Sequence, residues 1–537
     1  MSPRRLRAPA EDGALLAEPP LSEGPRVLES NRQHLGGWDH DFQGRRAGRL
    51  RSLTRAQVLN EARRFLEGYG LEVPDSTSGP PQTLIVTGHQ PEPYHPGVWV
   101  KNFAAEALAR RSGGVGLNLI VDNDVPKHAA VRVPFLDGGD LKARYVEFDA
   151  WAGDSPFEDL QVRDERAFAS FAERVNGLMG GLVPDPLLND DWPRAVALGD
   201  RTPLLWPRLA LMRRAREQDW GVRNLELPLS LVCQTEGFLW FASHLLAHLP
   251  RFRVIHNEAL RRYRAVYGIR SHHHPVPDLA EKADWLEAPF WAWRQERPRR
   301  RPLLARQVGP SLQLRIEGES DPLLELPLGP DRDACCAVDR LRELPRRGVR
   351  LRTRALTTTL FARLLLGDLF LHGIGGAKYD ELGDEIIRGF FGIEPPSYLT
   401  LSMTLWLGLP DDPEATPDQL RAVEHQLRDR EFNPDRHLPE PISAEARNLV
   451  EAKHQALAGP IETRQQRIDR FEAIRRCNEA LRPLVSADHA RLQTRKDRLL
   501  KGLRWNRLAR NREFACLLQS QSRLRKTMTR ITGLDSW

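Results

Sequence analysis

The segment 87–102 concentrates groups that can bind an anionic ligand. It follows the β-prone run 83–87 and overlaps the start of a helix pattern over 98–111, so it joins a strand to the N-terminus of a helix. That terminus offers unpaired N–H groups and a partial positive charge to a phosphate or a carboxylate. The residues expected to contact the ligand are Thr87, Gly88, His89, Gln90, His95, Gly97 and Lys101. The alternative is a strand-to-helix loop whose histidines only cap and pack.

Within this segment, the step His95-Pro96-Gly97 resembles the His-x-Gly-His loop by which nucleotidyltransferases hold ATP. Val98 stands in the place of the second histidine. The resemblance implies that the anionic ligand is a nucleotide. His89 and His95 would then donate hydrogen bonds to its phosphates, and Lys101 would add a positive charge.

A second polar cluster, Asp122-Asn123-Asp124, follows the predicted strand 117–121, and His128 lies close behind it. Two carboxylates at a strand end suit Mg²⁺, which prefers oxygen ligands, and they equally suit hydrogen bonds from a substrate amine or from sugar hydroxyls. The alternative is an Asx turn with a helix cap, which such residues form routinely. Both interpretations stay open on the sequence.

A third candidate is the glycine-rich segment 372–381, which lies between two helix patterns. Gly375 and Gly376 would let the backbone approach a ligand, Lys378 could neutralise a phosphate, and Tyr379 is expected to contact the same ligand. The segment is not a Walker loop, because no strand closely precedes it and the Walker spacing is absent. A plain turn between two helices is the alternative.

Two further clusters are weaker candidates for a functional site. Residues 271–275 include three adjacent histidines, but adjacent side chains cannot all face one ion and no second group of ligands is spaced to join them. No protein-held metal site is therefore predicted there. Residues 287–294 include Trp291 and Trp293, which could stack on a base or sugar, although packing within a subdomain is the favoured interpretation.

An alternation of strands and helices must position these candidates. The strands 83–87 and 117–121 flank the helix 98–111, and the closure of such a unit is a parallel, doubly wound sheet that gathers ligands at the carboxyl ends of its strands. Further along, the pattern predicts strands at 227–233 and 253–256 and helices at 238–249, 354–371 and 381–391. The segment 76–82, just before the first strand, is turn-rich.

Composition divides the chain into five segments. They are a mostly irregular N-terminal segment 1–50, a first part of the core 51–274, an inserted β-rich subdomain 275–345, a second part of the core 346–440 and a helical region 441–537. In the last region Ile461, Ile468 and Phe471 are spaced by seven and three, as in a heptad seam. The spacing predicts a short coiled coil and a homodimer formed through these helices.

The bulk composition is that of a folded protein outside the membrane. Hydrophobic residues make up 41% and charged residues 28%, and no run of about 20 apolar residues occurs. Five cysteines without metal-ligand spacing favour reduced thiols and a cytoplasmic location. The stretch 491–530 has 13 Lys or Arg against two acidic residues, a net charge of +11. A solvated helix face is the favoured interpretation of that charge, and nucleic-acid contact is the alternative.

In order along the chain, these motifs resemble the cysteine-adding enzyme family of bacillithiol biosynthesis, over residues 80 to 530. The family carries a Thr-Gly-Gln-Gln…Gly-Pro loop after its first core strand, and Thr87-Gly88-His89-Gln90…Pro96-Gly97 looks like a variant with His at position 89. The run Asp122-Asn123-Asp124…His128 is loosely similar to the family's acidic run. Arg354-Ala355-Leu356, followed by an apolar helix and Gly373-Ile374-Gly375-Gly376, is similar to a third family segment.

This resemblance implies an α/β fold with a Rossmann-like core and a C-terminal α-helical coiled coil. It implies a ligase that joins cysteine, or another carboxylate, to an amine such as glucosaminyl malate, with ATP or another nucleotide, and Mg²⁺, activating the carboxylate. His89, His95 and the helix N-terminus at Gly97 would stabilise the transferring phosphate. Asp122 or Asp124 would hold Mg²⁺ or the amine, with Asn123 and His128 beside them, and Arg354 or Lys378 would hold a carboxylate.

Three other functions remain as alternatives. A nucleotidyltransferase would release an adenylylated product. A nucleic-acid-binding protein would use the basic helices of 491–530, and its affinity would fall steeply with salt. A non-catalytic dimerising scaffold would bind no nucleotide.

Overall fold

The computed structural model describes residues 6–74, 83–151 and 153–533, and the chain divides into two compact units. Unit 1 comprises Met1–Val133, Arg144–Leu407 and Arg512–Trp537, and unit 2 comprises Pro134–Ala143 and Gly408–Asn511. The turn-rich segment expected at 76–82 lies outside the described residues.

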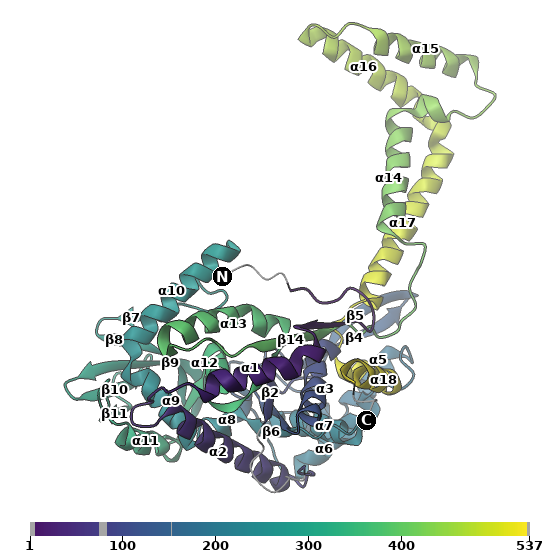
Figure 1. Ribbon diagram of the computed structural model, residues 1–537. Helices are drawn as coiled ribbons and strands as arrows, with labels where there is room; N and C mark the ends of the chain where they lie inside the picture. Colours follow the sequence, from purple (N-terminus) through teal and green to yellow (C-terminus); the bar gives the residue numbers. More distant parts are fainter. Residues whose placement is uncertain (1–5, 75–82, 152, 534–537) are drawn as a thin grey trace. The chain divides into compact units, whose positions relative to one another are not determined.

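A largely parallel sheet forms the centre of unit 1 (Figure 1). Within the described part of the chain its strand order is β1-β14-β13-β2-β3-β6. The strands are β1 (Leu15–Glu18), β2 (Leu84–His89), β3 (Val115–Ile120), β6 (Leu225–Pro228), β13 (Leu369–His372) and β14 (Tyr398–Met403). All neighbouring pairs from β14 to β6 are parallel, and β1 runs antiparallel to β14. The chain adds β3 and β6 on one side of β2 and β13 and β14 on the other, so the strand order reverses between β2 and β13.

Helices bury both faces of this sheet, which is why its strands are continuous apolar runs. The helix α3 (Pro96–Arg111) connects β2 to β3, and almost all of its residues are buried. Its small residues Ala104 and Ala105 pack with Ile85 and Leu371 in one core cluster. The helices α1 (Gly24–Gly36), α2 (Ala47–Gly68), α9 (Glu236–Ala247), α10 (Leu249–Tyr267), α12 (Ala355–Phe361) and α13 (Ile374–Ile386) also belong to unit 1.

Seven further α-helices of the described chain belong to unit 1. The helices are α4 (Glu165–Ala169), α5 (Phe171–Met179), α6 (Leu188–Ala197), α7 (Leu205–Asp219), α8 (Leu229–Val232), α11 (Cys335–Arg342) and α18 (Gln521–Thr532). A two-stranded antiparallel hairpin is formed by β4 (Ala130–Asp137) and β5 (Asp140–Glu147).

The predicted first strand, helix and second strand are confirmed as β2, α3 and β3. The strand predicted at 227–233 ends at Pro228, and α8 follows it. Two other predictions are wrong. Residues 253–256 lie inside α10, and the helix predicted over 354–371 ends in a π-helical turn at Leu366 and gives way to β13. Short apolar runs fit a buried strand and a buried helix equally well, which explains these errors.

The N-terminal segment is not irregular, contrary to the prediction for 1–50. It contains β1 and α1, and α2 begins at Ala47. Asn31 on α1 donates hydrogen bonds to the carbonyl oxygens of Asp368 and Ser397, at 2.9 and 2.8 Å, and accepts one from the Ser397 N–H. These partners lie more than 330 residues away along the chain, so no local pattern could have indicated them.

The β-rich segment predicted for 275–345 is confirmed as a second sheet of unit 1, but it also recruits a strand beyond that range. Its antiparallel order is β11-β10-β9-β8-β12, and β7 pairs with β8. The strands are β7 (Glu281–Lys282), β8 (Trp285–Arg294), β9 (Arg297–Val308), β10 (Ser311–Ile316), β11 (Leu324–Leu326) and β12 (Val349–Thr353). Because β12 leads directly into α12, the second sheet holds the start of α12 in place.

Unit 2 is mostly helical, as predicted for its residues 441–511, whereas its residues 408–440 were predicted as part of the core. The last part of the predicted helical region, 512–537, belongs to unit 1. It contains α14 (Pro417–Phe432), α15 (Ala444–Ala458), α16 (Arg464–Leu481) and α17 (Ser486–Ala509). Within it α14 lies beside α17, and Val423, Leu427 and Leu499 form their shared core (Figure 1). The expected seam residues Ile461, Ile468 and Phe471 are 51%, 41% and 64% exposed, so they do not pack within this unit. The homodimer through these helices stays a prediction.

Candidate functional site

A cavity of about 880 Å³ opens in unit 1 at the carboxyl ends of the parallel strands. Its lining residues include Gly88 and His89 at the end of β2, His372 at the end of β13 and Ser402 near the end of β14. The cavity therefore lies where the strand order reverses, which is the usual ligand-binding position of open α/β sheets. Its volume is in the range of small-molecule sites.

The N-terminus of α3 opens onto this cavity, and His95 caps it. The His95 Nδ1 accepts a hydrogen bond from the Gly97 N–H at 3.1 Å, so a neutral ring carries its proton on Nε2. That Nε2 lies 3.5 Å from the carboxylate oxygen of Glu513. Burial lowers the pKa of His95 to about 4, so the ring is neutral at pH 7 and presents an N–H donor.

Gly97 leaves room for a cation at the same helix end. A Cβ at this position would overlap the guanidinium of Arg512 and would lie 2.5 Å from the Met403 carbonyl oxygen. Arg512 donates hydrogen bonds to the Ser402 hydroxyl at 2.7 Å and to the Met403 carbonyl at 2.9 Å. The glycine thus allows an arginine from the C-terminal part of the chain to reach the first turn of α3.

Lys101, one turn further along α3, is almost completely buried and lines the cavity. Its ammonium donates a hydrogen bond to the Gly88 carbonyl oxygen at 2.8 Å. No carboxylate among the described residues forms an ion pair with it. Burial lowers the pKa of Lys101 to about 8. A buried ammonium without a counter-ion is costly, and an anionic ligand would remove that cost.

His89 contributes a neutral ring to the same wall. Burial, with the positive charge of Lys101 second, lowers the pKa of His89 to about 3. The His89 Nδ1 lies 3.3 Å from the Gln90 carbonyl oxygen, which can only accept, so the proton belongs on Nδ1 and the lone pair on Nε2. Tyr94 packs edge-on against the ring at 5.2 Å.

Asp124 also lines the cavity, and side chains of the described chain already satisfy it. It accepts a hydrogen bond from Gln90 at 2.8 Å and forms an ion pair with Arg300 at 2.8 Å. Asn123 donates to the Thr353 carbonyl oxygen at 2.9 Å. The role supported by these contacts is to position Gln90 and Arg300 along the wall.

Arg354 and Trp291 extend this wall. The Arg354 guanidinium lies 4.1 Å from the centroid of the Trp291 ring and donates to Glu287 at 2.6 Å. Arg300 also lies over the Trp291 ring, at 5.3 Å. Trp291 therefore serves as a packing surface for two arginines of the cavity.

The glycine-rich segment 372–381 is the start of a helix, and not the plain turn that was the alternative. Gly373 is the N-cap of α13 and has no side chain to block the helix end. A Cβ on Gly373 or on Gly375 would meet no other atom within 4 Å, so the first turn is open to the cavity. Lys378 and Tyr379 line the cavity from the next turn.

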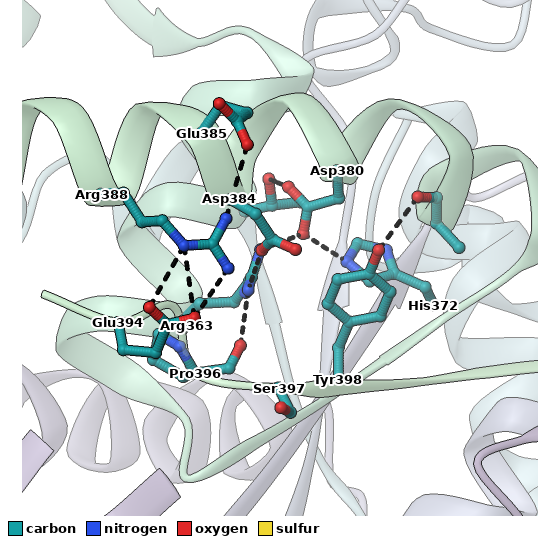
Figure 2. Close-up of polar contacts among 12 residues, drawn as sticks. Arg363, His372, Asp380, Asp384, Glu385, Arg388, Glu394, Pro396, Ser397 and Tyr398 are labelled. Atoms are coloured by element: carbon teal, nitrogen blue, oxygen red, sulfur yellow. Dashed lines mark hydrogen bonds and ion pairs between the residues drawn. The ribbon is translucent and has the colours of Figure 1, made fainter. Parts of the chain in front are cut away.

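His372 and its partners were not predicted as functional residues. The His372 Nε2 lies 2.7 Å from Asp380, which also accepts hydrogen bonds from Arg363 at 2.8 Å and Thr359 at 2.7 Å (Figure 2). These contacts outweigh burial and hold the pKa of Asp380 far below its usual value. The available sequence signal was a histidine at a strand end and an aspartate in the following helix.

The cavity lining has more basic than acidic side chains. Its described lining includes the basic residues Arg7, Lys101, Arg300, Arg354, Lys378 and Arg512. Asp124 is the one acidic residue within that lining, and Arg300 neutralises it. Together with the N-termini of α3 and α13, these side chains favour a ligand that carries more than one negative charge.

Three predicted site residues do not line the cavity. Thr87 is buried and donates to the Leu371 carbonyl oxygen at 3.1 Å, so it ties β2 to β13. His128 is exposed and stacks near Tyr145. Asp122 is fully buried and accepts a hydrogen bond from the Ser230 N–H at 2.9 Å. Burial and the neighbouring Glu158 raise the pKa of Asp122.

Asp122 and Asp124 face different partners, so they do not form one acidic pair at the cavity, and Mg²⁺ stays a prediction. Over residues 6–74, 83–151 and 153–533, no group of three or more His, Cys, Asp or Glu is arranged to hold a metal ion. Over the same residues, none of the helices is both long and apolar enough to cross a membrane.

The basic stretch 491–530 does not belong to a single unit. It is divided between the two units at Asn511. At least seven of its Lys and Arg side chains form ion pairs with acidic residues, namely Arg491, Lys496, Arg498, Lys501, Arg510, Arg512 and Arg523. Five of these seven ion pairs reach acidic residues distant in sequence and offset part of the local charge.

The fold and the cavity define an α/β protein with a cationic site at the carboxyl edge of a parallel sheet. Neither a family model nor a curated protein matches this chain in sequence comparisons.

Proposed function

We propose that the protein binds a nucleoside triphosphate in this cavity and uses it to activate a carboxylate for condensation with an amine. The observation that carries the proposal is Lys101, a buried ammonium without a carboxylate partner among the described residues, at the end of a cationic cavity. Each charge-assisted hydrogen bond to a bound phosphate would contribute about 1.5–3 kcal/mol.

The arrangement of donors supports phosphate at the α3 end. The His95 Nε2–H, the Lys101 ammonium and the Arg512 guanidinium all belong to that end of the cavity. Donors fixed by the fold stabilise charge that develops on a transferring phosphate without further reorganisation. Mg²⁺ supplied with the nucleotide would add positive charge there, held by the phosphates.

The core supports the same proposal. A parallel sheet whose order reverses beside the cavity, with a helix N-terminus at the end of β2, is what we expect of a Rossmann-like nucleotide site. We infer in addition that the paired helices α14 and α17 form a short coiled-coil arm around Val423, Leu427 and Leu499.

The resemblance of the sequence motifs to the cysteine-adding enzyme of bacillithiol biosynthesis supports cysteine as the acid and glucosaminyl malate as the amine. The arginines Arg300 and Arg354 would hold carboxylates of these substrates on the Trp291 side of the cavity. A nucleotidyltransferase would use the same phosphate site but would release an adenylylated product.

Product analysis tests the proposal. The purified protein is incubated with Mg²⁺, ATP, cysteine and glucosaminyl malate, and the mixture is analysed by mass spectrometry. We expect an amide of the two substrates together with ADP or AMP. An adenylylated substrate that is not consumed by the amine would favour the nucleotidyltransferase, and no turnover of ATP with any acid and amine would reject both enzymes.

A further inference from the structure

The His372 and Asp380 pair has the geometry of an oriented base and not only that of a packing contact. Asp380 is ionised and can only accept, so the His372 Nε2 carries the proton in their 2.7 Å hydrogen bond. The lone pair of the neutral ring is therefore on Nδ1. None of the contacts within the described chain places a hydrogen-bond donor on this Nδ1.

That free nitrogen lies beside the open first turn of α13. A Cβ at Gly376 would stand 2.7 Å from the His372 Nδ1, so the absence of a side chain there keeps the nitrogen accessible. Both residues line the cavity. Two aromatic rings also pack against His372, namely Phe370 at 4.5 Å and Tyr398, which lies edge-on at 4.7 Å and whose hydroxyl donates to the Ala377 carbonyl oxygen (Figure 2).

Asp380 is the charged neighbour that favours protonation of the His372 ring. Arg363 donates to Asp380 at 2.8 Å and to Asp384 at 2.6 Å, and the ring bonds Asp380 (Figure 2). Burial lowers the pKa of His372, and the positive charges of Arg363 and Lys101 lower it further, so the resting ring is neutral. Asp380 would stabilise the imidazolium once it forms.

We propose that His372 is the general base of the amine-addition step and that Asp380 is its positioning residue. The inference rests on the proposed function. The amine nitrogen attacks the acyl carbon of the activated acid, a C–N bond forms, and the C–O bond to the phosphate breaks with its electron pair leaving on oxygen. The His372 Nδ1 takes the proton that the amine nitrogen loses. The nucleoside triphosphate supplies the phosphate leaving group, so the step is balanced.

The test separates activation of the acid from addition of the amine. Hydroxylamine at high concentration traps an activated acid as a hydroxamate without needing a base, whereas glucosaminyl malate gives the amide. Both products are measured with ATP and cysteine for the wild-type protein and for the variants His372→Gln, Asp380→Asn and Asp384→Asn. The last is a matched control, since Asp384 bonds Arg363 in the same way but does not touch His372.

We expect His372→Gln to form hydroxamate at a rate near that of the wild type and amide about 100-fold or more slowly. Asp380→Asn should slow formation of the amide product at least about tenfold and leave hydroxamate formation unchanged. The N–H of the new asparagine side chain would donate to the His372 Nε2, so the ring would carry its proton on Nδ1 and could not accept another one there. Asp384→Asn should retain both reactions. In the wild-type protein the rate of amide formation should fall at low pH, and this fall should disappear in His372→Gln. If His372 only packed against its neighbours, its replacement would not change the pH dependence.

The outcomes are distinct. If His372→Gln forms amide at the wild-type rate, or if it loses hydroxamate and amide equally while remaining folded, the inference is overturned. If His372→Gln does not fold, the Asp380→Asn variant is used to test the inference. An Asp380→Asn protein with the wild-type rate of amide formation and the wild-type pH profile would reject the proposed role of the His372 and Asp380 pair. If the wild-type protein forms neither product, the proposed function fails and this inference falls with it.

Discussion

The ammonium of Lys101 lies 2.8 Å from the carbonyl oxygen of Gly88, and the lysine side chain is buried at the wall of the cavity. This contact joins the second turn of α3 to the end of β2, the two elements that frame the expected anion site. One carbonyl is weak compensation for a buried charge. The buried charge of Lys101 is therefore expected to destabilise the ligand-free protein.

Replacing Lys101 with methionine should stabilise the ligand-free protein by about 1 kcal/mol or more, because an uncompensated buried charge is removed while the apolar stem is retained. Denaturant unfolding measures the change. Lys282→Met is the matched control, since Lys282 is exposed and paired with Glu317, and its effect should stay within about 0.5 kcal/mol. A Lys101→Met protein that is less stable than the wild type would show that the ammonium is already compensated.

Stability should fall as the pH falls from about 6.5 toward 4, in part because of His95. The folded-state pKa of His95 is about 4, below the usual value of 6.5, so in this window the unfolded chain binds a proton that the folded protein does not. Each such proton contributes a slope of about 1.4 kcal/mol per pH unit. His95→Asn keeps a good helix cap and should show a shallower slope. His89, His40 and His244 titrate in the same sense, so the difference between the two proteins is the measurement. Identical slopes would mean that His95 is solvated.

The two glycines at the start of α13 should respond oppositely to alanine. Gly375→Ala places a methyl group in open space and should stabilise the helix by up to about 1 kcal/mol. Gly376→Ala places it 2.7 Å from the His372 ring, so the ring must move and the variant should be less stable than Gly375→Ala. Thermal unfolding of the pair gives the comparison. Equal melting temperatures would place the His372 ring elsewhere.

Asp368 anchors the N-terminal helix α2 to the start of the sheet. It accepts hydrogen bonds from Arg51 at 2.6 Å, from Arg55 at 2.9 Å and from the Leu84 N–H at 2.7 Å, and it is 3% exposed. Asp368→Asn removes the buried carboxylate that Arg51 and Arg55 share and should cost about 3–5 kcal/mol in urea unfolding. Glu61→Gln, on the same helix in an exposed pair with Arg64, should cost less than about 0.5 kcal/mol. A small effect at Asp368 would contradict this account of how α2 is held.

The sequence predicted ligand contacts in the segments 87–102 and 372–381 but not that strand ends bring these segments together. In the structure both follow parallel strands, the carboxyl ends of which meet at one edge, and Lys101 and Lys378 line one cavity. The strand β13 was not predicted, because four apolar residues between two helices have no period of their own.

Contacts between residues distant in sequence could not be predicted from the sequence pattern. Arg512 reaches the first turn of α3 from more than 400 residues away, and the glycine at position 97 makes room for it only in the folded chain. Asp122 and Asp124, two residues apart, were treated as a pair, but at the end of β3 one faces the buried Ser230 N–H and the other the cavity. A sequence pattern does not show in which direction either aspartate side chain points.

Nucleotide binding is the central claim, and calorimetric titration of the protein with ATP and Mg²⁺ tests it most directly. We predict one binding event per chain, an affinity at least about tenfold weaker in Lys101→Met, and an unchanged affinity in Lys282→Met. Absence of binding to the wild-type protein, or equal affinity in all three proteins, would contradict the assignment of the cavity as a phosphate site.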